Sequence, residues 1–183
     1  VAHEAYYVPV PDERAEALKT IEAFREVLEN EKIEKIGQNI KYDMLIMKWY
    51  GINIKGPIFD TMIAHYVVEP EMRHKLDYLA ESYLSYKMVP IEALIGKGVK
   101  QLSMRDIEVE RVSDYAAEDA DITFQMKAQL IPLMENINVA KVYNEIEVPL
   151  ISVLRDMEYE GVRIDKQLLH DYSGVLENKI RDK

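Results

Sequence analysis

The sequence contains no cysteine, few glycines and prolines, and no long apolar run. The absence of cysteine excludes disulfides, thiolate zinc sites and cysteine nucleophiles, and it favours a reducing, cytoplasmic home. Gly and Pro number seven each beside 48% hydrophobic residues, which excludes collagen-like, disordered and low-complexity chains. No apolar run approaches the roughly 18 residues of a membrane helix, and the first residues lack the regions of a secretion signal. We therefore expect a folded protein with no membrane contact.

Positive charge is also scarce. The 23 Lys and Arg oppose 33 Asp and Glu, which leaves a formal net charge of −10 over 183 residues. This balance excludes binding of DNA or membranes through a general basic surface. A local nucleic-acid groove stays open, as does a site in which carboxylates hold metal ions that meet phosphates. The length corresponds to one domain with some chain to spare.

Strand-like and helical patterns alternate three times within about the first seventy residues. This alternation is typical of α/β layering with some parallel pairing. Pro9 places the first strand at a sheet edge, because proline has no N–H to donate. Asp60 or Thr61 is expected to cap the third helix. The expected strands are residues 6–10, 32–39 and 52–60, and the expected helices are residues 13–31, 41–51 and 61–68.

The chain after Arg73 is predicted to be mostly helical. The expected helices cover residues 74–85 and 109–136, with a basic, glycine-punctuated loop at residues 95–104 between them. The last forty or so residues read as a helix, a turn at Gly161, a short extended stretch and a final helix.

Asp43 lies just after an expected strand, in the opening turn of a helix. Carboxylates at strand ends of α/β folds project into the crevice that binds ligands, which suits a functional acid. Compensation of the charge at a helix N-terminus is the simpler explanation of the same residue from the local pattern alone. Asn39 has a similar ambiguity, because an N-cap role accounts for it as well.

Tyr115 and Asp119 are four residues apart and therefore share one face of the expected helix, while Glu118 and Asp121 point elsewhere. A hard divalent cation prefers carboxylate oxygens, and a phenol beside such a carboxylate can orient a water for attack. A solvated helix face is the simpler alternative.

The remaining polar residues give weaker signals. The four histidines form no helical ligand pair; His65 is expected to face the core and His74 the surface. The Gly-Lys-Gly of residues 96–98 lacks the surroundings of a phosphate-binding loop. Lys97 and Lys100 suit either contact with a nucleic-acid backbone or an ordinary mobile loop. Most of the 12 tyrosines are assigned to packing rather than to base stacking.

Six segments in this order and spacing resemble the proofreading domain of family-A DNA polymerases and the first residues of the polymerase region. They are GQNIKYD, FDTMIAHYVVEP, HKLDYLAESYL, IGKGVKQLSM, YAAEDADITFQM and EIEVPLISVLRDMEYEGVRID. The similarity runs from about Ala5 to the end. It implies the RNase H-like α/β fold of DEDD exonucleases, a mixed sheet with flanking helices. Residues 1–138 would form the exonuclease domain, and residues 139–183 a helical C-terminal arm that begins the polymerase thumb.

The resemblance also implies a chemistry. Family members hydrolyse the terminal phosphodiester at a DNA 3′ end with four carboxylates and two divalent ions, Mg²⁺, Mn²⁺ or Zn²⁺, and they release nucleoside monophosphates. Asp43 and Asp119 match metal ligands, and Tyr115 matches the residue that orients the nucleophile. Asn39 and Tyr42 match the second motif and are expected to contact DNA.

Lys97 and Lys100 are expected to add DNA contacts. In the parent enzyme the partners would be a single-stranded 3′ end and primer–template DNA, during replication and repair in a bacterial cytoplasm, associated with the nucleoid.

The sequence departs from the family at its start. The first exonuclease motif, an Asp-x-Glu on the first strand, has no counterpart before Ala5, and Asp60 belongs to a later turn. We expect an incomplete two-metal site with little activity in the chain as given. The sheet would lack its first strands, so we expect a piece of a longer polypeptide, or completion by altered or intermolecular pairing, as in a dimer.

Two other functions stay open. An RNase D-like exoribonuclease shares the motifs, but the C-terminal residues favour the polymerase family. A structural exonuclease-like domain without catalysis is the non-enzymatic alternative, and the presence of Asp43, Tyr115 and Asp119 argues against it.

Overall fold

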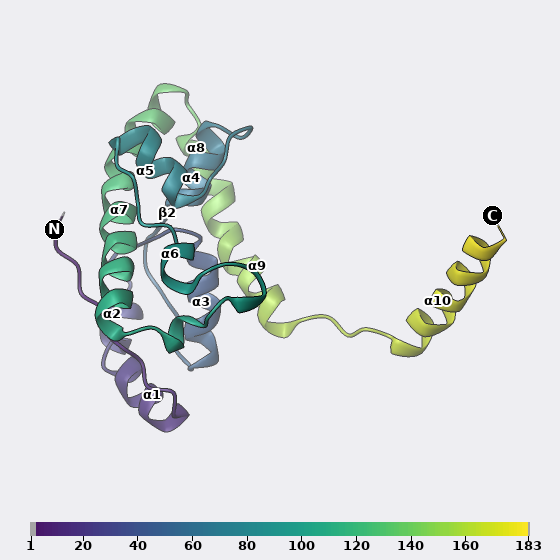
Figure 1. Cartoon of the computed structure of the whole chain (residues 1–183). Helices are drawn as coiled ribbons and strands as arrows, with labels where there is room; N and C mark the ends of the chain where they lie inside the picture. The colour runs from purple at the N-terminus through teal and green to yellow at the C-terminus, as the bar shows by residue number, and fades with distance from the viewer. Residues whose placement is uncertain (1–2, 183) are drawn as a thin grey trace.

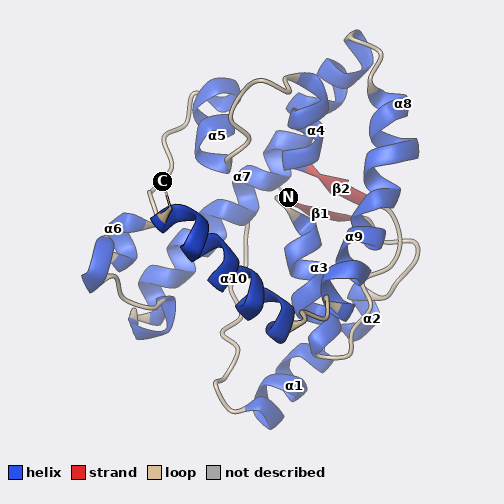
Figure 2. Ribbon diagram, turned by 90° about the vertical axis from the view of Figure 1, so that its right-hand side faces the viewer, coloured by secondary structure: helices blue, strands red, loops and turns tan. Residues whose placement is uncertain are grey.

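A computed structural model describes residues 3–182 and shows a small parallel sheet among helices (Figures 1 and 2). Strand β1 (Lys35–Gly37) pairs in parallel with β2 (Ile58–Asp60), with Lys35 opposite Ile58 and Gly37 opposite Asp60. Helix α3 (Ile40–Trp49) forms the crossover between the two strands. The predicted parallel α/β unit is confirmed, since parallel neighbours need such a connection.

Helices make up most of the described chain (Figure 2). They are α1 (Arg14–Glu22), α2 (Arg25–Leu28), α4 (Thr61–Val68), α5 (Leu76–Leu84), α6 (Glu92–Ile95), α7 (Val109–Asn136), α8 (Ala140–Val142), α9 (Val148–Glu160) and α10 (Lys166–Arg181), with short helical turns η1 (Gly98–Lys100), η2 (Met104–Asp106) and the π-helical η3 (Tyr143–Glu147).

The long helix α7 packs against α4, α5 and β1 and forms one side of the main core. Its apolar face recurs at helical spacing, and the buried members include Ile122, Met126, Leu130 and Met134. A second, smaller core lies between α3 and α9, where Ile151 packs with Ile40 and Met44. The sheet is therefore held between α7 on one side and α3 with α9 on the other.

The strand predicted at residues 6–10 is wrong. This segment is extended and runs beside α7, but it pairs with no strand among residues 3–182 (Figure 1). A strand needs a partner for its backbone groups, and Pro9 and Pro11 remove two donors. The predicted mixed sheet is likewise a parallel pair within the described residues.

The predicted helix at residues 13–31 is interrupted at Ala23 and Phe24. Arg25 there binds Glu22, Glu29 and the carbonyl of Gly51, and the last contact is one that local periodicity does not encode. The other predicted helices are confirmed with small shifts of their ends, whereas both confirmed strands are shorter than predicted.

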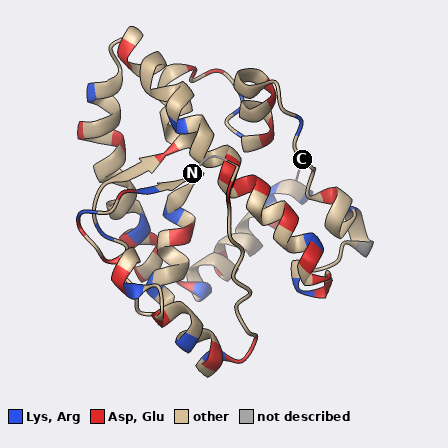
Figure 3. Cartoon of the chain, turned by 90° about the vertical axis from the view of Figure 1, so that its left-hand side faces the viewer, with Lys and Arg blue, Asp and Glu red and all other residues tan. Residues whose placement is uncertain are grey.

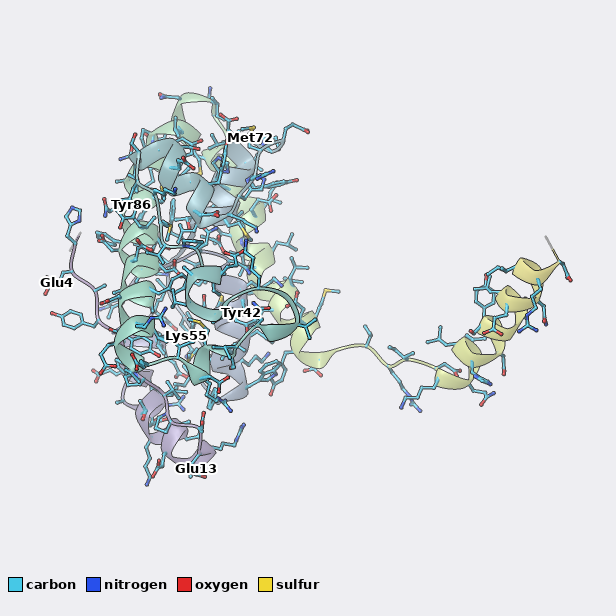
Figure 4. All side chains as sticks on the ribbon, in the orientation of Figure 1. Glu4, Glu13, Tyr42, Lys55, Met72 and Tyr86 are labelled. Carbon is cyan, nitrogen blue, oxygen red and sulfur yellow. The ribbon has the colours of Figure 1, made fainter. Side chains whose placement is uncertain are left out.

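The C-terminal arm leaves the body of the molecule after α9. Gly161 ends α9 with a φ of 70°, residues 162–165 are extended, and α10 projects into solvent with every described residue exposed (Figures 1 and 4). No helix among residues 3–182 is both long enough and apolar enough to span a membrane.

Candidate functional site

A pocket of about 600 Å³ opens between the end of β1, the start of α3, the start of α5 and the middle of α7. Asp43, Tyr115 and Asp119 all line it, although 76 residues separate the two carboxylates in the sequence. The fold thus brings together the three residues predicted to do chemistry. Pockets beyond the carboxyl ends of parallel strands are the usual ligand sites of α/β folds.

The turn from β1 into α3 places Asp43. Gly37 ends the strand, and a Cβ there would lie 2.9 Å from Cβ of Ile40, so only glycine fits without movement. Asn39 follows in the left-handed conformation, with a φ of 58°, which asparagine tolerates better than most residues. Asn39 occupies the predicted N-cap position, but its side chain caps no backbone N–H. The first turn of α3 then directs Asp43 to the pocket.

Asp60 stabilises that turn from β2. Its carboxylate is completely buried and accepts four backbone N–H groups: those of Asn39 (3.3 Å), Ile40 (2.8 Å), Met62 (2.9 Å) and Ile63 (3.1 Å). The predicted cap of α4 is confirmed, and the same side chain also caps α3. Burial raises the pKa of Asp60, and the four donors act against that rise.

The carboxyl of Asp43 is an unusually weak acid for an aspartate. Partial loss of hydration raises its pKa to about 6, and the negative charge of Asp60 adds to the rise. Asp43 nevertheless keeps solvent access as an exposed residue on the pocket wall. A cation bound at this wall would relieve the repulsion and favour the ionised form.

Tyr115 and Asp119 face the pocket from one side of α7, as their spacing predicts. Burial raises the pKa of Asp119 to about 6, with help from the charge of Glu118. Burial and the Asp119 carboxylate raise the pKa of the Tyr115 phenol to about 12, so the phenol keeps its proton at neutral pH. A protonated phenol beside a carboxylate can hold a water molecule by hydrogen bonds.

The donors fit a divalent cation in type and only partly in number. Two aspartates facing one pocket supply the hard oxygen ligands that Mg²⁺ and Mn²⁺ prefer. Within residues 3–182, no three Asp, Glu, His or Cys residues lie close enough together to hold an ion. Asp43 and Asp119 alone therefore fall short of a full ligand set, and the other ligands of a cation would have to come from water, substrate or further protein groups.

The described side chains among those predicted to contact DNA lie outside the wall of this pocket. Tyr42 of α3, labelled in Figure 4, is 60% exposed. Lys97 is exposed on the loop before η1, and its ammonium lies 4.0 Å from Glu92, which lines the pocket. The side chain of Lys100 lies outside the part of the chain that the structure describes. None of Asn39, Tyr42 and Lys97 lines the pocket itself.

Sequence reasoning missed several residues of the pocket wall, among them Gln38, Asp77 and Glu92. Gln38 accepts a hydrogen bond from the hydroxyl of Thr61 (2.6 Å) and donates one to the carbonyl of His74 (2.7 Å), which ties β1 to the start of α5. No local pattern marks these residues, because each reaches the pocket through tertiary packing.

The histidines are only partly as predicted. His65 is buried in the core, which confirms its prediction. His74 is half-buried instead of lying on the surface, because its Nδ1 lies 2.7 Å from Nδ1 of His65. Burial, followed by the neighbouring His74, lowers the pKa of His65.

Comparisons with known proteins identify the family of this chain. A family model described as 3′–5′ exonuclease, of the DNA polymerase A group, matches residues 2–135. The DNA polymerase I of Rhizobium leguminosarum is 36% identical over 151 residues, which cover 82% of this chain and 15% of that protein. The DNA polymerase I of Pseudomonas aeruginosa is 35% identical over an alignment of 187 positions, which covers 97% of this chain and 20% of that protein. The chain thus spans about a fifth or less of the length of these relatives.

Solved structures share the fold at lower identity. The polymerase domain of Pol1 from M. smegmatis, in complex with DNA primer-template and dNTP, has a TM-score of 0.72 at 21% identity and covers 90% of this chain and 25% of that chain. NrnC of Brucella melitensis has a TM-score of 0.60 at 21% identity, and the match covers 75% of this chain and 66% of the NrnC chain. A further structure of NrnC from Brucella melitensis contains bound Mg²⁺. It has a TM-score of 0.55 at 22% identity, and the match covers 76% of this chain and 66% of the NrnC chain.

Proposed function

Because this chain belongs to the 3′–5′ exonuclease family of A-type DNA polymerases, we propose that it forms most of the proofreading domain of a bacterial DNA polymerase I. The observation that carries the proposal is the convergence of Asp43, Tyr115 and Asp119 on one pocket. The substrate would be a frayed single-stranded 3′ terminus, hydrolysed to nucleoside monophosphates during replication and repair in the bacterial cytoplasm. Residues 1–138 would be the nuclease part and residues 139–183 the start of the thumb.

The residues divide the work by their chemistry. Asp43 and Asp119 would hold divalent cations, which supply a more acidic bound water and charge neutralisation at the phosphate. Tyr115 stays protonated and would position the attacking water through its hydroxyl. Asn39, Tyr42, Lys97 and Lys100 would contact the sugars, bases and phosphates of the strand. The negative charges of the carboxylates in the pocket would repel a phosphate group when no cation is bound. Binding of DNA at the pocket would therefore depend on metal binding.

The two candidate aspartates are fewer than the four carboxylates of a complete DEDD site, so we propose that the 183-residue chain alone has little exonuclease activity. We also propose that the two-stranded sheet belongs to a larger RNase H-like sheet, completed within a longer polypeptide or by a second copy. Light scattering decides between the last two options for the isolated chain. A monomeric mass excludes the second copy, and a doubled mass supports it.

A chimeric enzyme tests the proposed function. The stretch of the Pseudomonas aeruginosa enzyme that aligns with this chain is replaced by this chain, and release of the 3′ nucleotide from a mismatched primer is measured with Mg²⁺. We expect activity in the chimera and background rates in the isolated chain. Asp119→Ala should lower the rate of the chimera by at least about 100-fold, because a metal ligand is lost.

Asp114→Ala is the matched control, because Asp114 is an exposed acid on the same helix outside the pocket. A chimera that folds and polymerises but does not cleave supports the structural, non-catalytic alternative. Robust cleavage by the isolated chain that disappears in Asp43→Ala refutes the proposed incompleteness of its site.

A further inference from the structure

A buried tyrosine outside the matched family region connects to the nuclease pocket. The family model ends at residue 135, whereas Tyr143 lies in η3 and is 1% exposed, as one of the largest fully buried side chains. Its ring packs against Phe59 with centroids 5.4 Å apart, so phenylalanine would fill the same space. The hydroxyl therefore needs a separate explanation, since a buried polar group is costly unless it is bonded.

The hydroxyl of Tyr143 is bonded to the main chain of Asp60 in both directions. It accepts the N–H of Asp60 at 2.8 Å and lies 3.3 Å from the carbonyl oxygen of the same residue, to which it donates. Asp60 is the last residue of β2, and β1 is the only strand that pairs with β2 among the described residues. Tyr143 thus takes the place of a neighbouring strand at this end of β2.

Asp60 passes this constraint to the helix that carries Asp43. Its carboxylate accepts the N–H groups of Asn39 and Ile40, the two residues at which α3 begins. These bonds set the position and rotation of the first turn, and Asp43 is the fourth residue of the helix. A continuous series of hydrogen bonds therefore runs from Tyr143 through Asp60 to the start of α3.

The following helix also binds α3 at its surface. Lys41 pairs with Glu158, and Lys48 lies 2.6 Å from Asp156 and 4.3 Å from the ring centroid of Tyr159. Both lysines belong to α3 and all three partners to α9. Residues 143–160 therefore hold α3 at its beginning through Asp60 and along its length through ion pairs.

We infer that Tyr143 is a positioning residue of the nuclease site, which acts through Asp60 to fix the first turn of α3 and the carboxylate of Asp43. The inference rests on the proposed function for its catalytic consequence. The geometric part stands without it, because the hydrogen bonds to Asp60 are independent of any reaction. Segment 143–160 is then part of the nuclease site although the family match stops before it.

Tyr143→Phe isolates the hydroxyl, because it keeps the ring that packs on Phe59. In the 183-residue chain, hydrogen exchange followed by NMR should show the amides of Asn39 and Ile40 exchanging about tenfold or more faster, beyond any change in the slowest core amides. In the chimeric polymerase, kcat for 3′ cleavage should fall about 10- to 100-fold while KM for DNA stays within about twofold, because positioning and not binding is lost.

Two controls separate positioning from general stability. Leu130→Val removes a methylene group from the same core without removing any hydrogen bond of Asp60, and it should weaken folding without a change in kcat at temperatures well below Tm. Tyr86, labelled in Figure 4, is exposed, and its hydroxyl donates a hydrogen bond to Glu118 of α7. Tyr86→Phe removes this hydroxyl and should leave kcat unchanged.

Unchanged exchange at Asn39 and Ile40 in Tyr143→Phe overturns the inference. So does a kcat loss no larger than that of Leu130→Val. A chimera with no cleavage at all counts against the proposed function, and the exchange measurement still decides whether Tyr143 controls the start of α3.

Discussion

At the scale of single residues, the pocket holds two carboxyls in surroundings that oppose their ionisation. Asp43 and Asp119 each have a pKa raised to about 6, chiefly by lost hydration. Neither lies close to an Arg or Lys in an ion pair among the described residues. Such uncompensated acids are typical of functional sites, where stability is sacrificed for ligand binding.

Asp119→Asn should therefore stabilise the chain at neutral pH. A carboxyl whose pKa is higher in the folded than in the unfolded state destabilises the fold above both values, and the cost fades as the pH falls from about 6 toward 4. Water at the pocket screens the charge, so we expect a gain of about 1 kcal/mol near pH 7.5 and none near pH 4. Urea unfolding at the two pH values measures it.

Asp114→Asn is the control for this effect, because Asp114 is exposed outside the pocket. It should change the free energy of unfolding by less than about 0.5 kcal/mol at either pH. A gain for Asp119→Asn of equal size at both pH values, or a loss near pH 7.5, would mean that the surroundings of Asp119 do not oppose its charge.

Local sequence identified some of these residues and not others. The pairing of Tyr115 with Asp119 follows from helical spacing, and the motif around Asp43 marks it by resemblance. Gln38 and Asp77 carry no local signal, because they enter the pocket only when β1 and the start of α5 come together. The hydrogen bonds between the Asp60 carboxylate and the start of α3 could not be predicted from the local sequence either, because their donors are 20 and 21 residues away from Asp60.

At the scale of elements, the turn between β1 and α3 is the most constrained part of the site. It combines a glycine that excludes any Cβ, a left-handed asparagine and two backbone bonds to Asp60. Periodicity predicted α3, α4 and α7 because each has a buried face of its own. The strand predicted at residues 6–10 was wrong for the opposite reason. A strand is stabilised by a partner strand, and the local sequence does not show whether a partner is present.

Gly37→Ala should destabilise the chain by about 1 to 3 kcal/mol, because the new methyl group would lie 2.9 Å from Cβ of Ile40 and force α3 to move. Gly174→Ala is the matched control. Gly174 lies in the exposed helix α10 with no atom within 4 Å of an added Cβ, so this change should leave Tm of the core unaltered. Thermal unfolding compares the two, and an equal Tm for both variants would show that the turn adapts without cost.

At the scale of the whole molecule, the net charge of −10 suits the proposed function, in which contact with DNA would depend on metal ions. Figure 3 shows acidic residues along much of α7, the helix that contributes Tyr115 and Asp119 to the pocket. Such a surface attracts divalent cations and repels bare phosphate. The chain spans about a fifth or less of the length of the DNA polymerase I relatives, and its exposed arm ends in α10.

The proposed function depends on the binding of a divalent cation by Asp43 and Asp119 in one pocket. Addition of Mn²⁺ to the ¹⁵N-labelled chain tests it most directly, because the paramagnetic ion broadens the signals of nearby amides. We expect that amides in the first turn of α3 and around Asp119 broaden together, that Asp119→Ala removes both effects and that Asp114→Ala removes neither. Broadening scattered over the acidic surface, or unaltered in Asp119→Ala, would contradict it.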